Sequence, residues 1–264
     1  MLAKLVNIFL PFIFVILVCS CSQQRQLAKE FLNKKDSLSI LILRTDTVFK
    51  KNLKKNNDSI SDTTNSLFLG KTKNITLINL IYTGLIDELK KRKLKVYTDE
   101  NMNSFMSLPS ESYIFNMSQI EMDEYVIPYS FSQDYDEDEY YQDFNLNAVS
   151  LNTWFEVSEL NGEQEKSKVL YSSKSINDNV YGYFRRNYLY DEIYFNYRRT
   201  DITLDDIYKS ALNFGYTNAD YIFDYFLNQY VYENYKGKMK KNYLHYDIKK
   251  NRFIKAEKNR FIFM

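Results

Sequence analysis

The stretch from Ala148 to Val157 has the sequence Ala-Val-Ser-Leu-Asn-Thr-Trp-Phe-Glu-Val. Its side chains largely alternate between apolar and polar, which is typical of a strand with one buried face. The buried side consists of Val149, Leu151, Phe155 and Val157, and Trp154 and Glu156 lie on the other side. Asn161-Gly162-Glu163 follows, and Asn-Gly favours a hairpin turn. The run from Lys168 to Ile176 supplies the partner strand, so this region predicts an antiparallel hairpin.

A further strand precedes the hairpin, between Ser112 and Tyr129. Its apolar residues alternate up to Met117 and resume with the opposite parity at Ile120 and Met122. An extra residue in one strand produces such a change of parity, so we expect a β-bulge in this strand. The three strands together predict an antiparallel meander.

The N-terminal part predicts a strand, a helix and a second strand. Leu38 to Leu43 is short and apolar, as a buried strand is. From Ile75 to Lys93, leucine and isoleucine recur at three- and four-residue steps and basic residues close the segment, which is typical of an amphipathic helix. Lys95 to Thr98 is the second strand, parallel to the first if the helix is a crossover. The polar segment Lys50 to Asn74 is expected to be a surface loop.

Helices are predicted near the C-terminus. Thr203 and the acidic Asp206 form an N-cap pattern, and Gly215 is expected to end that helix before another starts near Thr217. The apolar residues expected to face the body are Leu204, Ile207, Tyr208, Ala211, Ile222, Phe223, Phe226, Tyr230 and Val231. The basic segment 236–264 contains two similar octads, and we expect a hairpin or an extended tail. The fold class is therefore α+β: a small α/β unit continued by an antiparallel β meander, with C-terminal helices packed on it.

The first 21 residues predict the location of the protein. Lys4 precedes an apolar run from Leu5 to Val18, which matches a secretory signal and is too short for a comfortable membrane span. Val18-Cys19-Ser20-Cys21 resembles the lipobox of bacterial lipoproteins. That resemblance implies cleavage before Cys21 and diacylation of its sulfur, and two or three acyl chains anchor stably. An ordinary secretory signal or an uncleaved anchor with incidental cysteines is the alternative.

The predicted organisation follows from this leader. Residues 1–20 are the signal peptide, 21–37 a lipidated tether, 38–235 a single globular domain, and 236–264 the basic tail or hairpin. The residues after Cys21 include no acidic run, which by resemblance favours the periplasmic face of the outer membrane over the cell surface. The body resembles uncharacterised periplasmic lipoproteins. From Leu38 to Ile176 its order of elements also resembles the α/β domain of curli-export-type lipoproteins, a likeness that transfers no function.

Composition excludes several classes of function. The whole chain has 35 basic and 34 acidic residues, and a nearly neutral chain lacks the basic excess of a dedicated nucleic-acid binder. Cleavage before Cys21 leaves a single cysteine, so the mature chain has no internal disulfide. With one histidine, His245, and one acylated cysteine, His-based triads, Cys–His dyads and common zinc sites are not expected. We expect no cofactor.

Two polar segments are candidate sites. Asp134, Asp136 and Asp138 have the spacing of a calcium loop, but Glu139 replaces the required glycine and Asn145 the terminal glutamate, so a solvated hairpin loop is expected and no metal site. Residues 180–199 interleave tyrosine with arginine, as in faces that stack on sugars or on a partner's side chains. A flap packed on the core is the alternative. The candidate face comprises Tyr181, Tyr183, Arg185, Arg186, Tyr188, Tyr190, Arg198 and Arg199.

These observations favour a nonenzymatic lipoprotein of the bacterial envelope. It would be attached to the outer membrane through Cys21 and would bind another envelope protein or polymer from the periplasmic side. The alternatives are a carboxylate-based hydrolase of envelope polymers, which requires a cleft with paired acidic residues, and an oligomeric export component.

Overall fold

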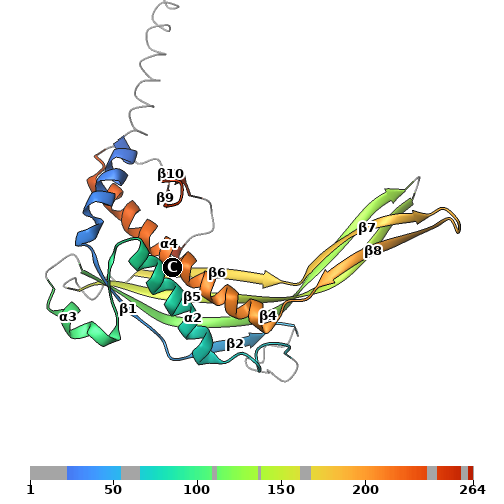
Figure 1. Ribbon diagram of the computed structural model, residues 1–264, viewed down its shortest axis with the longest axis horizontal. Coiled ribbons are helices and arrows are strands. Elements are labelled where there is room, and N and C mark those ends of the chain that lie inside the picture. Colours follow the sequence, from blue (N-terminus) through green and yellow to red (C-terminus); the bar gives the residue numbers. More distant parts are fainter. Residues whose placement is uncertain are drawn as a thin grey trace, which may run out of the picture.

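A mixed β-sheet forms the centre of the computed structural model, which describes residues 23–54, 66–108, 112–135, 138–160, 168–236, 243–256 and 261–263. In spatial order its strands are β11 (Ile262–Phe263), β6 (Lys168–Asn177), β5 (Asp138–Glu159), β4 (Ser112–Tyr135), β1 (Ser39–Leu43) and β3 (Lys95–Tyr97). A seventh strand, β2 (Val48–Asn52), pairs with β4 beside β1. Helices cover one face of this sheet, and a long β arm extends from the body (Figure 1). The predicted signal peptide, Cys21 and the predicted Asn161–Glu163 turn lie outside the described residues.

The predicted α/β unit is present. β1 (Ser39–Leu43) pairs in parallel with both β3 (Lys95–Tyr97) and β4 (Ser112–Tyr135). Helix α2 (Asn74–Lys91) is the crossover between β1 and β3. A short 3-10 turn, η2 (Asp99–Asn101), and helix α3 (Met102–Met106) lead from β3 toward β4.

The segment expected to be a surface loop begins within a strand. β2 (Val48–Asn52) pairs in parallel with β4 from Ile120 to Glu124. Val48 is buried in the core, and Lys50 donates hydrogen bonds to two carbonyl groups of the turn before α2, those of Leu69 and Thr72. The sequence does not indicate a strand here because only Val48 of the five side chains is buried and three of the others are polar.

The predicted antiparallel meander is present. β5 (Asp138–Glu159) pairs antiparallel with β4 along its length and with β6 (Lys168–Asn177) from Ala148 to Val157. The ladder between β4 and β5 shifts between Met117 and Gln119, which confirms the bulge that the parity change predicts. Because of this shift, Met117, Ile120 and Met122 are all buried.

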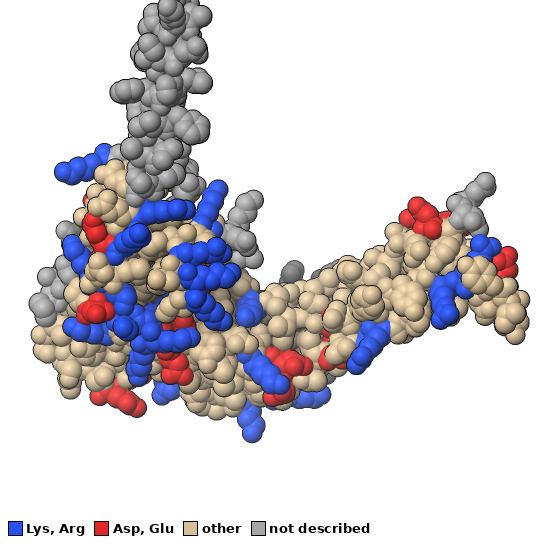
Figure 2. Space-filling view, turned by 45° about the horizontal axis from the view of Figure 1, so that its top comes forward, with Lys and Arg blue, Asp and Glu red and all other residues tan. Residues whose placement is uncertain are grey.

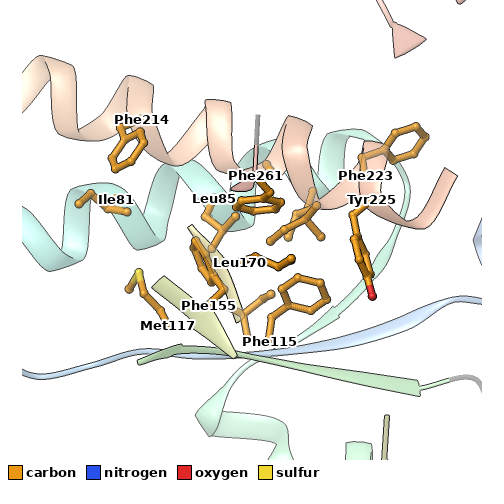
Figure 3. Close-up of a cluster of buried hydrophobic side chains, with 14 of the residues drawn as sticks. Ile81, Leu85, Phe115, Met117, Phe155, Leu170, Phe214, Phe223, Tyr225 and Phe261 are labelled. Atoms are coloured by element: carbon orange, nitrogen blue, oxygen red, sulfur yellow. The ribbon is translucent and has the colours of Figure 1, made fainter. Parts of the chain in front are cut away.

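The helix layer closes the core on one face of the sheet. Helices α2 and α4 (Leu204–Asn234) lie across this face of the sheet. Side chains from both helices meet side chains from β4, β5 and β6 in the core (Figure 3). Residues 23–34 are also helical and are followed by a 3-10 turn, η1 (Lys35–Ser37). Ala28 and Phe31 of this helix are buried in the core, so most of the segment predicted to be a tether packs on the body instead.

Helix α4 differs from the prediction at one point. Thr203 caps it as predicted, since the Thr203 hydroxyl accepts from the amide of Asp206 and the Asp206 carboxylate accepts from the amide of Thr203. The predicted end at Gly215 is wrong, because one helix of 31 residues continues through it. Gly215 serves instead as a contact point with α2, where its lack of a side chain lets the two backbones approach.

The arm and the C-terminal hairpin complete the fold. The arm combines the distal halves of β4 and β5 with the hairpin of β7 (Asn179–Asn187) and β8 (Glu192–Thr200). Near the C-terminus, β9 (Leu244–Asp247) and β10 (Arg252–Lys255) form a second hairpin, and β11 (Ile262–Phe263) returns to pair with β6. The α+β class predicted from sequence is thus confirmed.

Candidate functional site

The β arm has its own aromatic interior. The ring of Phe195 on β8 lies 4.9 Å from Phe131 on β4 and 4.8 Å from Phe184 on β7, measured between centroids. Gly182 leaves the space for this ring, since a Cβ atom there would lie 2.4 Å from Phe195. The hydroxyl of Tyr135 donates to the carbonyl of Phe184 and ties the two hairpins together. The arm is therefore two β-hairpins packed face to face.

Alternation along β7 and β8 directs a second set of side chains away from this interior. The paired positions across the two strands are Tyr181 with Arg198, Tyr183 with Asn196, and Arg185 with Tyr194. We call these six residues the Tyr–Arg face. All of them are exposed, and Tyr181 retains 76% of its accessible surface. Among the described residues, neither Arg185 nor Arg198 takes part in an ion pair.

The turn between β7 and β8 presents three large side chains at the end of the arm. Tyr188, Leu189 and Tyr190 are 87%, 89% and 73% exposed. The Asn187 side chain accepts a hydrogen bond from the amide of Leu189, and Asp191 has a left-handed backbone with φ of 53°. The turn is thus held by its own polar residues, while its apolar side chains lie in solvent.

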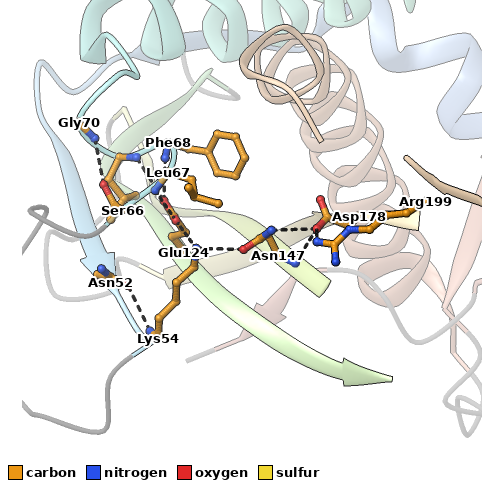
Figure 4. A network of polar contacts seen from close by, with 11 residues as sticks. Asn52, Lys54, Ser66, Leu67, Phe68, Gly70, Glu124, Asn147, Asp178 and Arg199 are labelled. Carbon is orange, nitrogen blue, oxygen red and sulfur yellow. Dashed lines mark hydrogen bonds and ion pairs between the residues drawn. The ribbon is translucent and has the colours of Figure 1, made fainter. Parts of the chain in front are cut away.

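A polar network joins the base of the arm to the body (Figure 4). The buried carboxylate of Asp178 accepts from the amides of Asn147 and Ile202 and forms an ion pair of 2.6 Å with Arg199. Burial alone would raise the pKa of Asp178, but these hydrogen bonds outweigh it and hold the pKa below its usual value. Lys54 bonds both Asn147 and the buried Glu124, which extends the network to β4.

The structure separates the predicted face into four groups. Tyr181, Tyr183, Arg185 and Arg198 lie together on the Tyr–Arg face, and Tyr188 and Tyr190 lie at the tip. Arg186 is on the opposite side of β7 and pairs with Asp191 at 2.8 Å. Arg199 belongs to the network at the base. Period-two alternation requires Arg185 and Arg186, and likewise Arg198 and Arg199, to point to opposite sides.

Tyr194, Asn196 and Leu189 belong to this surface but are absent from the predicted set. The first two alternate with Arg198 along β8, so strand periodicity is the signal that identifies them. Leu189 is an apolar residue at a turn, and only the structure shows that no other described residue covers it.

No protein-family model and no curated protein matches this chain. The proposed function therefore depends on the geometry of the chain itself.

The acidic segment lies at the distal turn of β4 and β5. Asp134 pairs with Glu139 across the two strands, and the hydroxyl of Tyr141 donates to Glu139. Asp136 lies outside the described residues. Within the described part of the chain, no group of three or more Asp, Glu, His or Cys side chains is arranged to hold a metal ion.

Each helix in the described part of the chain is too short or too polar to span a bilayer.

The body contains a second candidate, a cleft of about 500 Å³ beside the C-terminal end of α2. Arg92 pairs there with Asp220 at 2.5 Å and with Glu88 at 3.3 Å. Burial raises the pKa of Asp220, against the opposing effect of Arg92. At the same cleft, His245 Nδ1 lies 2.7 Å from the buried Asp224 carboxylate. In the neutral imidazole Nδ1 then carries the proton, which leaves Nε2 as an acceptor.

Proposed function

We propose that this protein is a nonenzymatic lipoprotein of the bacterial envelope. Acyl chains on Cys21 hold it on the periplasmic face of the outer membrane, and the β arm binds another envelope protein or polymer. The observation that carries the proposal is the exposed Tyr–Arg face together with the apolar tip.

The packing of the arm supports this role. Phe131, Phe184 and Phe195 already fill its interior, so the outer tyrosines are not needed to hold the two hairpins together. Tyrosine and arginine are the residue types that most often dominate the energy of protein interfaces, because they combine a large apolar area with hydrogen-bonding groups. Clustered exposure of such residues favours an interaction surface over a packed flap.

Site-specific photo-crosslinking in the native host tests the proposal. A photoreactive amino acid replaces Tyr183 on the Tyr–Arg face or Tyr190 at the tip. The matched control is Tyr232, which is 69% exposed on α4 and lies outside the arm. We expect a discrete crosslinked species from the two arm positions and none from Tyr232. Equal crosslinking from all three positions, or none from the arm, would contradict the proposal.

The anchor has its own test. Mass spectrometry of the membrane fraction should detect an acylated N-terminal peptide that begins at Cys21, and Cys21→Ala should abolish it. An unmodified protein in the soluble fraction would overturn the lipoprotein assignment while leaving the arm experiment unaffected.

One observation favours a second candidate, a carboxylate-based hydrolase of envelope polymers. The cleft beside Arg92 contains the two carboxylates that such an enzyme requires, Glu88 and Asp220. Both are ion-paired with Arg92, which favours a structural role. If the purified protein hydrolysed cell-wall glycans or peptides and Asp220→Asn removed that activity, the nonenzymatic assignment would be wrong.

A further inference from the structure

Three segments that are distant in sequence meet at the end of the body where the described chain begins. A second cleft, of about 490 Å³, is lined by Leu32 and Lys35 from the N-terminal helix and η1, by Lys91 and Arg92 from the end of α2, and by Tyr246 from the C-terminal hairpin. Lys35 donates a hydrogen bond of 2.8 Å to the carbonyl of Arg92. This bond ties η1 to the end of α2, and Tyr246 of the C-terminal hairpin lines the same cleft.

The exposed side chains of these segments are predominantly basic. Residues 23–38, 87–95 and 243–256 contain 13 lysines and arginines against five acidic residues, although the whole chain has a net charge of only +1. Three of the five acids are ion-paired: Asp36 with Lys35, Glu88 with Arg92, and Asp247 with Lys250. Lysine and arginine side chains gather over this part of the body in Figure 2. The exposed cations are Arg25, Lys29, Lys34, Lys90, Lys91, Lys93, Lys95, Lys249, Lys250, Arg252 and Lys255.

We infer that this surface, which we call the basic face, docks on the anionic headgroups of the membrane that holds the protein. The inference rests on the anchor at Cys21 but not on the binding role of the arm. Cys21 is two residues from the first described residue, Gln23, and two residues span at most about 7 Å. An acylated Cys21 therefore keeps the start of the N-terminal helix close to the lipid surface.

Charge complementarity indicates that the basic face contacts anionic lipid headgroups. Clusters of lysine and arginine beside a membrane anchor are attracted to anionic lipids, and the attraction acts over about 8 to 10 Å at physiological ionic strength. Arg25 and Lys29 lie four and eight residues after Cys21, so they are the first of these cations to reach the headgroups once the anchor is inserted. An acyl anchor alone leaves the body free to rotate on its chain, whereas contacts from three segments restrict its orientation.

Docking of this face also separates the arm from the lipid surface. Helix α4 runs from the base of the arm at Thr203 to the basic face, where its residue Phe223 packs on Phe31 and Tyr246. The 20 residues from Leu204 to Phe223 span about 30 Å. The helix thus acts as a strut that holds the arm base away from the headgroups.

The test uses the full, lipidated chain in nanodiscs of two compositions, one purely zwitterionic and one containing phosphatidylglycerol. Lysine reactivity toward an amine-labelling reagent is measured residue by residue by mass spectrometry. We expect labelling of Lys91, Lys93, Lys249 and Lys250 to fall several-fold in the anionic nanodiscs only. The exposed lysines Lys71, Lys73 and Lys209, which lie outside the basic face, should label equally in both.

Salt and matched substitutions distinguish docking on the membrane from binding of a soluble anion. Salt at about 0.5 M should restore labelling, because exposed charges are then screened. The triple variant Lys91→Gln, Lys93→Gln, Lys249→Gln should lose protection at Lys250 and Lys255, whereas Lys71→Gln, Lys73→Gln, Lys209→Gln should keep it. Equal labelling in the two nanodiscs would overturn the inference. Protection by inorganic phosphate in detergent would also overturn it, by indicating a phosphate pocket.

The result of the lysine-labelling experiment does not depend on whether the arm binds a partner. Crosslinking at Tyr183 and Tyr190 reports on the proposed partner, and the mass of the Cys21 peptide reports on the anchor. If the lysines are not protected in anionic nanodiscs, while the arm crosslinks and the acylated Cys21 peptide are still detected, membrane docking alone is refuted.

Discussion

Gly84 and Gly215 face each other where α2 crosses α4, and a Cβ atom on Gly215 would lie 2.2 Å from the carbonyl oxygen of Ile81. A Cβ atom on Gly84 would meet the carbonyl oxygen of Leu212 at 2.3 Å. Both obstacles are backbone atoms, which cannot move unless the helices separate. The glycine pair therefore sets the distance between the two helices that cover the core.

Gly215→Ala should destabilise the protein although alanine is the better helix former. We expect a loss of about 1–3 kcal/mol or more in the free energy of unfolding, because the helices must move apart and open the core. Urea unfolding followed by circular dichroism measures it. Gly70→Ala is the matched control, since no atom lies within 4 Å of the added Cβ. A stabilised Gly215→Ala variant would show that the helices do not touch at this point.

Glu124→Gln should also be destabilising. The buried carboxylate accepts from the amides of Leu67, Phe68 and Leu69 and forms an ion pair of 2.7 Å with Lys54. Replacing a charged acceptor with an amide weakens these bonds and leaves Lys54 without its counterion, at a cost of about 2 kcal/mol. Glu233→Gln, at an exposed position on α4, should have little effect in the same unfolding experiment. Equal effects of the two substitutions would refute the prediction.

Asp178 should contribute stability that acid removes. Its folded-state pKa is lowered by its hydrogen bonds, so the contribution is present above the unfolded-state pKa and is lost as the pH falls through the folded-state pKa. Asp178→Asn should be less stable than the wild type at pH 7, and the difference should shrink below about pH 4. Unfolding measured across about pH 2–7 tests this expectation. A difference that stays constant over that range would exclude it.

Asp123 should have the opposite effect on the pH dependence of stability. Burial, together with the nearby charge of Glu121, raises its pKa. The native state therefore retains a proton that the unfolded state has released, and stability falls as the pH rises from the unfolded-state pKa to the folded-state pKa. Asp123→Asn removes this penalty and can still accept from Ser150 and Asn152. We expect the variant to be at least as stable at pH 7 in the same unfolding experiment, and a clear loss there would contradict the assignment.

Much of the sheet could be predicted because strand alternation is a local property. The bulge is an example, since the change of parity between Met117 and Ile120 is visible in the sequence and appears as the register shift. The strand β2 could not be predicted in this way. Its residues are mostly polar, and only pairing with β4, about 70 residues further along the chain, makes it a strand.

The candidate surface was partly predictable for the same reason. Composition identified residues 180–199 as rich in tyrosine and arginine, but it did not assign those residues to sides of a strand. Arg199 looked equivalent to Arg198, yet it binds Asp178 at the base of the arm. The cleft beside Arg92 had no signal in the sequence, because its residues come from α2, α4 and the C-terminal hairpin.

Local patterns in the sequence predict three features that the structure contains: the amphipathic helix α2, the alternating strands of the meander and the Thr203 cap. The lipobox pattern at Cys21 is equally local and stays a prediction. Each depends on residues within a few positions of one another. Tertiary structure alone decided that α4 continues through Gly215, that residues 23–34 pack as a helix on the core, and that two hairpins form an arm. These outcomes depend on contacts between distant segments, whose packing energy outweighs local preferences.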